Sequence, residues 1–249
     1  MRLEEQHALV TGAGTGIGAA IARMLAAEGA SVTLVGRRRE KLEKVAHALR
    51  APAGHMVVAP ADVTDRGSID QAFARARAAH GPITILVNNA GAAEGAPFGK
   101  VSERLWRDML AVNLDGMFHC CQAALPDLLA AARGRIVTIA SMAGLHGFAY
   151  AAPYIAAKHG AVGLTRALAA EFAKTGLTAN AVCPGFVDSD MTAQSIANIR
   201  AKTGRSEEQA LAELARLNPS GRLIAPREVA AATLDLILSE RNGEAVEIA

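Results

Sequence analysis

The stretch Thr11-Gly12-Ala13-Gly14-Thr15-Gly16-Ile17-Gly18 joins an apolar run at residues 7–12 to a helical pattern over residues 16–28. Glycine at such a turn lets the backbone approach a pyrophosphate, and the N-terminus of the following helix offers unpaired N–H groups and a partial positive charge. Glycine clusters also occur in ordinary tight turns. The position of this one, between a strand and a helix at the head of the chain, favours a dinucleotide-binding turn.

Short apolar runs rich in strand-forming residues alternate with helical patterns along the whole chain. Most runs are apolar on both faces, as in a sheet covered by helices on both sides. The alternation predicts an α/β fold: one domain over residues 1–249, with a Rossmann-type doubly wound parallel sheet of seven strands. The expected strands are 7–12, 31–36, 55–63, 83–91, 134–141, 177–185 and 245–249, and the expected helices are 16–28, 38–50, 66–79, 103–131, 153–174 and 226–238.

The bulk composition excludes several classes of protein. The 26 basic and 24 acidic side chains nearly cancel and aromatic residues are only 4%, so we expect no nucleic-acid partner. Because no apolar run is long enough to span a bilayer and no signal peptide is recognisable, we expect a cytoplasmic protein without a membrane partner. The three cysteine residues lack C-x-x-C spacing and the seven histidine residues lack metal-ligand spacing, so we expect reduced thiols and no catalytic metal.

Three arginine residues, Arg37, Arg38 and Arg39, follow the second expected strand. A site that prefers NAD usually has an acidic residue there to bind the ribose 2′-hydroxyl. Cations at a helix start oppose the helix dipole by roughly a few tenths of a kcal/mol each, and a bound 2′-phosphate would reverse that effect and accept bidentate contacts. The arrangement favours NADP(H). NAD(H) is the alternative if the arginines form a solvated cluster balanced by Glu40 and Glu43.

Tyr154 and Lys158 lie four residues apart on one face of an expected helix, and Ser141 lies thirteen residues upstream of Tyr154. The ordinary pKa of tyrosine is about 10, and a nearby ammonium favours the phenolate, which improves the phenol as a proton donor and acceptor. Ser141 adds a hydroxyl for the same substrate oxygen. The triplet predicts proton transfer at an alcohol or carbonyl oxygen. The same spacing also occurs where a core tyrosine precedes a solvated lysine.

Further motifs follow in order: Asp62-Val63, then Asn88-Asn89-Ala90-Gly91, Asn113 and Pro184-Gly185. With the glycine turn and the triplet, they make the whole chain resemble the short-chain dehydrogenase/reductase family. The resemblance implies a catalytic set of Asn113, Ser141, Tyr154 and Lys158. Lys158 would bind the nicotinamide ribose and lower the pKa of Tyr154, and Asn113 would hold a water for proton relay. The expected cofactor-binding residues are Gly12, Thr15, Gly16, Ile17, Gly18, Arg37, Arg38, Asp62, Val63, Asn89, Ala90, Gly91, Tyr154, Lys158, Pro184, Gly185 and Val187.

The family usually has a threonine where this chain has Ser189, which keeps a hydroxyl for the cofactor, and Thr192 is an alternative donor. The candidate substrate residues form a mostly apolar wall and are Met142, His146, Phe148 and Phe186. The stretch 190–218 is expected to be a helical lid. Its basic residues Arg200, Lys202 and Arg205 would meet a coenzyme A or carrier-linked substrate, or form a solvated helix face.

The sequence around Tyr154 is similar to 3-oxoacyl-thioester and polyketide ketoreductases and to 3-hydroxybutyrate dehydrogenases. The resemblance implies hydride transfer between a ketone and a secondary alcohol. A 3-oxoacyl-thioester reductase or 3-hydroxyacyl dehydrogenase is favoured, and 3-hydroxybutyrate or another secondary alcohol is the alternative substrate. It also implies a homotetramer or homodimer formed through the outer faces of the helices at 103–131 and 153–174.

Two readings outside the oxidoreductases remain. A carbon–halogen lyase built on the same fold keeps the serine and tyrosine but replaces the lysine, and Lys158 together with the intact glycine turn argues against it. A non-catalytic, cofactor-binding scaffold would have lost its catalytic residues, whereas all of the expected ones are present here. Turnover of a ketone or an alcohol by the purified protein distinguishes an enzyme from such a scaffold.

Overall fold

The structure is a computed structural model that describes residues 1–48 and 55–249. Its seven parallel strands form one sheet in the order β3-β2-β1-β4-β5-β6-β7, which confirms the predicted fold class. The strands are β1 (His7–Thr11), β2 (Ser31–Gly36), β3 (Met56–Pro60), β4 (Ile85–Asn88), β5 (Arg135–Ile139), β6 (Thr178–Pro184) and β7 (Ala245–Ile248). The helices are α1 (Gly16–Ala27), α2 (Arg39–Ala48), α3 (Arg66–His80), α4 (Glu103–Leu110), α5 (Gly116–Ala130), α6 (Ala152–Glu171), α7 (Asp190–Thr203), α8 (Glu207–Ala215) and α9 (Pro226–Leu238).

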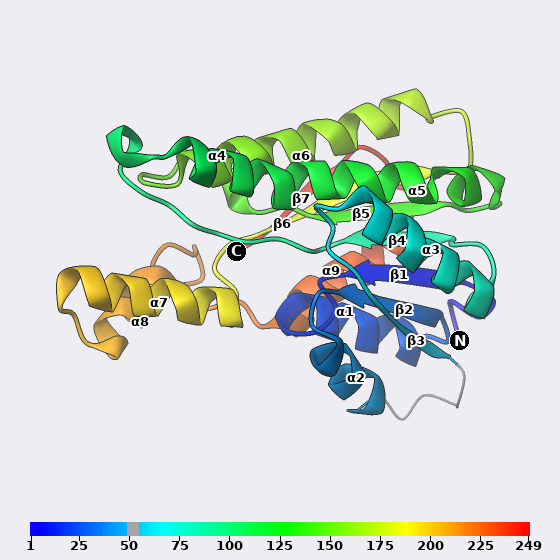
Figure 1. Ribbon diagram of the computed structural model, residues 1–249, viewed down its shortest axis with the longest axis horizontal. Helices are drawn as coiled ribbons and strands as arrows, with labels where there is room; N and C mark the ends of the chain where they lie inside the picture. Colours follow the sequence, from blue (N-terminus) through cyan, green and yellow to red (C-terminus); the bar gives the residue numbers. More distant parts are fainter. Residues whose placement is uncertain (49–54) are drawn as a thin grey trace.

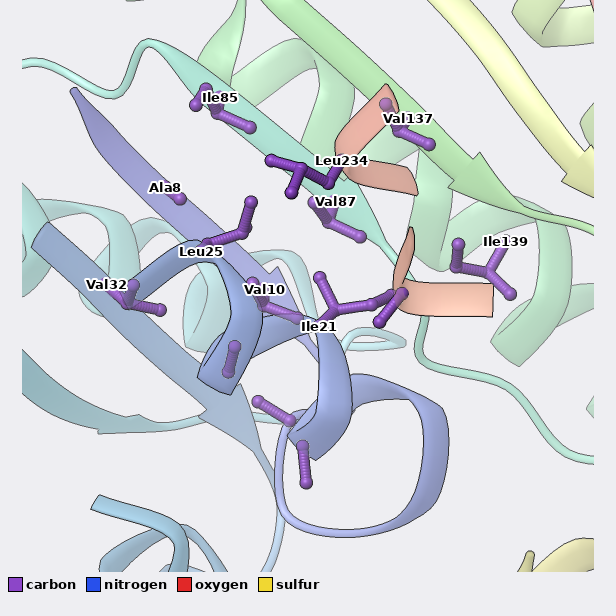
Figure 2. Packing of buried hydrophobic residues seen from close by; sticks show 14 of the residues in the cluster. Ala8, Val10, Ile21, Leu25, Val32, Ile85, Val87, Val137, Ile139 and Leu234 are labelled. Atoms are coloured by element: carbon purple, nitrogen blue, oxygen red, sulfur yellow. The ribbon is translucent and has the colours of Figure 1, made fainter. Parts of the chain in front are cut away.

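Helices cover both faces of the sheet, with α4, α5 and α6 on one side and α1 and α2 on the other (Figure 1). Successive side chains of β1 therefore enter different cores, since strand side chains alternate between faces. Val10 packs with Ile21 of α1 and Leu234 of α9, as Figure 2 shows, whereas Leu9 packs with Phe73 of α3. Burying an aliphatic side chain of this size contributes about 1.5–3 kcal/mol, so both cores hold the sheet in place.

The strand order reverses beside β1, which pairs with β2 on one edge and with β4 on the other. The connections after β1 and β4 therefore leave on opposite sides of the sheet and open a crevice at the carboxyl ends of the strands. In open α/β sheets this is where ligands bind.

The expected helix 103–131 is interrupted by a π-helical turn at Ala111–Asp115, which separates α4 from α5. Such turns insert a residue into a helix and often occur at functional sites, and this one holds Asn113. Gly116, the first residue after the π-helical turn, lies against Val63, since a Cβ at Gly116 would stand 2.7 Å from Val63 Cγ2. The helix therefore packs closely on the turn after β3.

The stretch 190–218 contains two helices, α7 and α8, that break at Gly204, where φ is 72°. Figure 1 shows both projecting from the side of the molecule on which the chain ends. α8 begins with a capping box in which the Ser206 side chain accepts from Gln209 N and the Gln209 side chain accepts from Ser206 N. The expected helix 38–50 ends at Ala48 in the described part, and its last two residues lie outside that part.

Within residues 1–48 and 55–249, no helix combines the length and apolar character needed to cross a membrane. The same ranges contain no group of three or more His, Cys, Asp or Glu side chains arranged to hold a metal ion. The three cysteines are buried free thiols. Burial raises the pKa of Cys120, that of Cys121 to about 12 and that of Cys183 to about 11, so all three are protonated at neutral pH.

Candidate active site

A pocket of about 480 Å³ lies among the loops that follow β1 to β6. Of the expected cofactor-binding residues, all except Gly18 line it. Gly18 lies behind the glycine turn, where a Cβ would stand 2.3 Å from the Gly12 carbonyl oxygen, so its place in the sequence reflects packing of α1 on that turn. The structure therefore brings together loops from both halves of the chain around one pocket.

The glycine turn is shaped by positive φ angles, 64° at Gly12 and 51° at Gly16, which strongly favour glycine. Thr15 is the N-cap of α1, and its side chain makes no capping hydrogen bond. Asn89 fixes the turn from below, because its Nδ2 donates to the carbonyl oxygens of Thr11 (2.9 Å) and Gly12 (3.2 Å). The result is a rigid cradle at a helix N-terminus, suited to a pyrophosphate.

Cationic side chains line the pocket at the end of β2. Arg37 and Arg38 are exposed, and neither forms an ion pair with any described residue. Lys41, one turn further along, also lines the pocket; sequence reasoning missed it, although its spacing from Arg37 and Arg38 is helical. Arg39 does not line the pocket, and its Nη1 lies 3.4 Å from Glu43 Oε1. Of the three arginines, therefore, only Arg39 is paired with a glutamate, as the alternative of a solvated cluster would require.

The three residues expected to be catalytic, Ser141, Tyr154 and Lys158, converge from the end of β5 and from α6. Ser141 follows β5 and caps a short 3₁₀ turn, with its Oγ 3.1 Å from Ala143 N. Lys158 is buried, and its Nζ donates to the Ile139 carbonyl oxygen at 3.0 Å and lies 5.7 Å from the centre of the Tyr154 ring. Serine hydroxyl, phenol and ammonium thus line one wall of the pocket.

The protein's own groups raise the pKa of Tyr154, because burial disfavours the phenolate more than a hydrogen bond to Ser141 favours it. The expectation that Lys158, together with the positive nicotinamide of a bound oxidised cofactor, lowers this pKa concerns the cofactor-bound protein and stays a prediction. Burial also lowers the pKa of the Lys158 ammonium to about 8, and the ammonium lies beside the phenol ring. Positive charge on a bound group beside the phenol would favour the phenolate and so oppose the effect of burial.

We expect the buried Lys158 side chain to lower the free energy of unfolding at neutral pH. Its pKa is about 8 in the folded protein and ordinarily 10.5, so the unfolded chain binds more protons between these values and stability rises with pH across that window. Below pH 8, the buried ammonium lowers the free energy of unfolding by roughly 3 kcal/mol. We expect Lys158→Met to exceed the wild type in unfolding free energy at pH 7, by a margin that shrinks as the pH approaches 10.5. Denaturant titrations at several pH values measure this, with the exposed Lys174→Met as control. A margin independent of pH would contradict it.

The Asn113 side chain holds the loop after β4. Its Nδ2 donates to the carbonyl oxygens of Ala92 (2.9 Å) and Met109 (3.0 Å). Asn113 does not line the main pocket. With Lys158 and Asn88 it lines a small cavity of about 10 Å³, close to the minimum that holds one water. The Asn88 Oδ1 atom is buried there without a hydrogen-bond partner in the described protein, which makes this a polar site for a water behind the ammonium.

Of the candidate substrate residues, Met142, Phe148 and Phe186 line the pocket. His146 does not: its Nε2 lies 3.5 Å from Glu247 Oε1, and the side chain is about half exposed. The loop after the 3₁₀ turn carries His146 towards the end of β7, so the structure does not bring it together with the other candidate substrate residues. A local apolar pattern does not show which way a loop side chain points.

Asn218 is the functional residue that sequence reasoning missed most clearly. It lies after α8 and is buried, and its Oδ1 accepts from Phe186 N at 2.8 Å. Its Nδ2 donates to the carbonyl oxygens of Phe186 (2.9 Å) and Arg222 (2.6 Å). Asn218 therefore fixes the turn after β6 to the end of α8. The only sequence signal was an Asn-Pro pair, which is typical of any turn.

The hydroxyls that follow this turn are both close to Val187. Thr192 Oγ1 donates to the Val187 carbonyl oxygen at 2.6 Å, and Ser189 Oγ lies 3.3 Å from the same oxygen and caps α7. Both residues line the pocket. Ser189 lies opposite the glycine turn, since a Cβ at Gly16 would stand 3.4 Å from Ser189 Cβ.

Comparison with known proteins agrees with this geometry. The sequence pattern of the family described as short chain dehydrogenase matches residues 6–200. A putative ketoacyl reductase of the granaticin polyketide synthase from Streptomyces violaceoruber is 42% identical over 226 residues, 90% of this chain and 83% of the relative. The D-beta-hydroxybutyrate dehydrogenase of Cupriavidus necator is 36% identical over 230 residues, 92% of this chain and 89% of the relative.

Among solved structures, an actinorhodin polyketide ketoreductase with NADPH superposes with a TM-score of 0.93 and is 36% identical, covering 100% of this chain and 97% of that one. The matched pattern spans most of the chain, and the sheet order, the glycine turn and the serine–tyrosine–lysine wall all occur together. The protein therefore belongs to the short-chain dehydrogenase family of oxidoreductases.

Proposed function

We propose that the protein is an NADP(H)-dependent oxidoreductase that interconverts a ketone and a secondary alcohol, with a 3-oxoacyl thioester as the favoured ketone. One observation carries the proposal: the Ser141 and Tyr154 hydroxyls share a single pocket with the glycine cradle and with Arg37 and Arg38. A proton donor, a pyrophosphate site and cations for a 2′-phosphate are the parts that such a reaction needs. Bound reduced nicotinamide would supply the hydride.

The side chains of the pocket would stabilise the developing charge and transfer the proton. Negative charge develops on the carbonyl oxygen during reduction, and hydroxyl donors from Ser141 and Tyr154 stabilise it more in the transition state than in the ground state. Tyr154 gives its phenolic proton to that oxygen. Lys158, with a pKa of about 8, is mostly protonated at pH 7 and can return a proton towards the phenol. The small cavity between Lys158, Asn88 and Asn113 would hold the water that resupplies it.

The choice of substrate rests on the pocket wall and on the relatives. Met142, Phe148 and Phe186 offer an apolar surface for an acyl chain, and the polyketide relative carries the name ketoacyl reductase. A second candidate, 3-hydroxybutyrate, is favoured only by the likeness to a D-beta-hydroxybutyrate dehydrogenase.

Contacts in the lid weaken the case for a phosphorylated carrier. Arg200 Nη1 lies 3.0 Å from Glu207 Oε2, and Arg205 pairs with Glu213, so both arginines already have acidic partners. The side chain of Lys202 lies outside the described part. Arg200 and Arg205 therefore do not supply free cations for the phosphates of coenzyme A or a carrier.

Initial rates of NADPH and NADH oxidation with acetoacetyl-CoA test the proposal, with the Tyr154→Phe variant as the blank. Turnover that favours NADPH supports both the thioester and the arginine argument. A faster reaction with NADH would overturn the cofactor preference. If no ketone and no secondary alcohol is converted with either nucleotide, the oxidoreductase proposal itself fails.

Asn218→Ala should raise the KM for NADPH by roughly tenfold, because the turn after β6, which lines the pocket and would contact the nicotinamide, loses its anchor at Phe186. The lost buried hydrogen bonds should also lower the unfolding free energy by about 1–3 kcal/mol. Asn180→Ala is the matched control. Its buried amide donates to Arg241 O and accepts from Glu244 N, away from the pocket, so stability should fall without a change in KM. Equal KM values in both variants would contradict the assignment.

We also propose that α7 and α8 form a lid over the pocket, since Met191, Ser195 and Leu217 of this region line it.

We further propose that the protein is cytoplasmic and forms a homotetramer or homodimer. The exposed apolar side chains of Trp106 on α4 and Phe118 on α5, which are 38% and 43% exposed, support a subunit interface on these helices.

A further inference from the structure

We infer that the substrate end of the pocket selects ketones without a negative charge near the carbonyl group, and that Glu94 is the residue that repels carboxylates. The inference rests on the proposed function and narrows its substrate class. It separates neutral ketones, esters and thioesters from keto acids such as acetoacetate.

Glu94 is placed at the catalytic end of the pocket by the contacts of its neighbours. Ala92, two residues before it, is bonded through its N–H and carbonyl oxygen to the side chain of Asn113. Gly95, directly after it, lies so close to the next loop that a Cβ would stand 2.1 Å from the Tyr150 carbonyl oxygen. Glu94 is therefore held between the Asn113 turn and the start of α6, which carries Tyr154. Its side chain is exposed and lines the pocket.

The cations of the pocket lie elsewhere. Arg37, Arg38 and Lys41 follow β2, beside Asp62 and Val63, where the adenosine would bind. Lys158 is buried, and its Nζ donates to the Ile139 carbonyl oxygen. Among the described lining residues these are the only Lys or Arg side chains, and His146 is turned to Glu247.

The rest of the substrate end offers a carboxylate no counter-charge. Its wall includes Met142, Phe148, Phe186, Met191 and Leu217, and its charged neighbour on α7 is the acidic Asp190. A carboxylate buried beside apolar groups needs a paired cation, because losing its hydration is costly. Here it would meet Glu94 instead. Repulsion of a wrong substrate is an established way to obtain specificity.

The test compares two ketones of nearly equal size that differ in charge: acetoacetate and acetoacetamide. The measured quantity is the ratio of kcat/KM for acetoacetate to that for acetoacetamide, with NADPH, in the wild-type protein and in Glu94→Gln and Glu94→Lys. We expect a ratio well below one in the wild type, a rise of about three- to tenfold in Glu94→Gln and a larger rise in Glu94→Lys. Added salt should raise the wild-type ratio, because Glu94 is exposed and its field is screened. Glu171→Gln, at the far end of α6, is the control and should leave the ratio unchanged.

The outcomes separate the two proposals. If acetoacetate is reduced as well as acetoacetamide, or if the Glu94 variants leave the ratio unchanged, the inference is overturned while the oxidoreductase function stands. If both small ketones are poor substrates but acetoacetyl-CoA is reduced, the ratio of their inhibition constants against that reaction is measured in the same variants, and a ratio that Glu94→Gln and Glu94→Lys leave unchanged overturns the inference. If no ketone at all is reduced by the wild type, the proposed function fails and this inference fails with it.

Discussion

Tyr154→Phe is expected to lower kcat by about 10²–10⁴-fold, the range that a positioned acid–base group supplies. The variant loses a single oxygen, the atom that would donate to the carbonyl oxygen together with Ser141. The dissociation constant for NADPH should change little, since the glycine cradle, Arg37 and Arg38 remain. Steady-state rates with acetoacetyl-CoA and a fluorescence titration with NADPH measure the two quantities on the same preparation.

The chain supplies a matched control for this experiment. Its other tyrosine, Tyr150, is four residues upstream, 69% exposed and absent from the pocket lining. Tyr150→Phe removes the same atom from a neighbouring position and should keep near-normal kcat. Near-normal turnover in Tyr154→Phe would eliminate Tyr154 as the proton donor, whatever the control does.

The double variant Arg37→Asp/Arg38→Ala should lose about 10²–10⁴-fold in kcat/KM for NADPH. Two charge-assisted contacts to a 2′-phosphate, each worth about 1.5–3 kcal/mol, account for this loss. The kcat/KM for NADH should stay the same or rise, because the carboxylate introduced by Arg37→Asp can accept a hydrogen bond from the ribose 2′-hydroxyl. The wild-type preference for NADPH should also weaken with added salt, since both arginines are exposed.

Arg39→Ala is the control for these arginines. It removes the third consecutive guanidinium, which pairs with Glu43 and does not line the pocket. The nucleotide preference of this variant should match that of the wild type. A double variant that still prefers NADPH would show that Arg37 and Arg38 are only a solvated helix start.

The fold class and most of the lining of the pocket could be predicted from the amino-acid sequence. Strand and helix periodicity is a local property, so the seven strands could be predicted from short windows. The glycine turn and the Tyr154–Lys158 spacing each describe a local conformation as well, whereas Asn89 is expected from the family resemblance. The parallel order then brings the ends of β1, β4, β5 and β6 together, because carboxyl ends of parallel strands meet at one edge of the sheet.

The directions of the loop side chains and the charge distribution of the site could not be predicted, because they depend on contacts between segments far apart in the chain. Asn218 fixes Phe186, 32 residues away in the chain, and no local pattern encodes that contact. His146 turns towards Glu247, and the contacts of Ala92 with Asn113 and of Gly95 with Tyr150 place Glu94 between the Asn113 turn and the start of α6. The pKa of Tyr154 is set by burial, which depends on everything packed around the phenol. Periodicity fixes the elements, whereas long-range packing fixes loop geometry and electrostatics, and those decide the substrate.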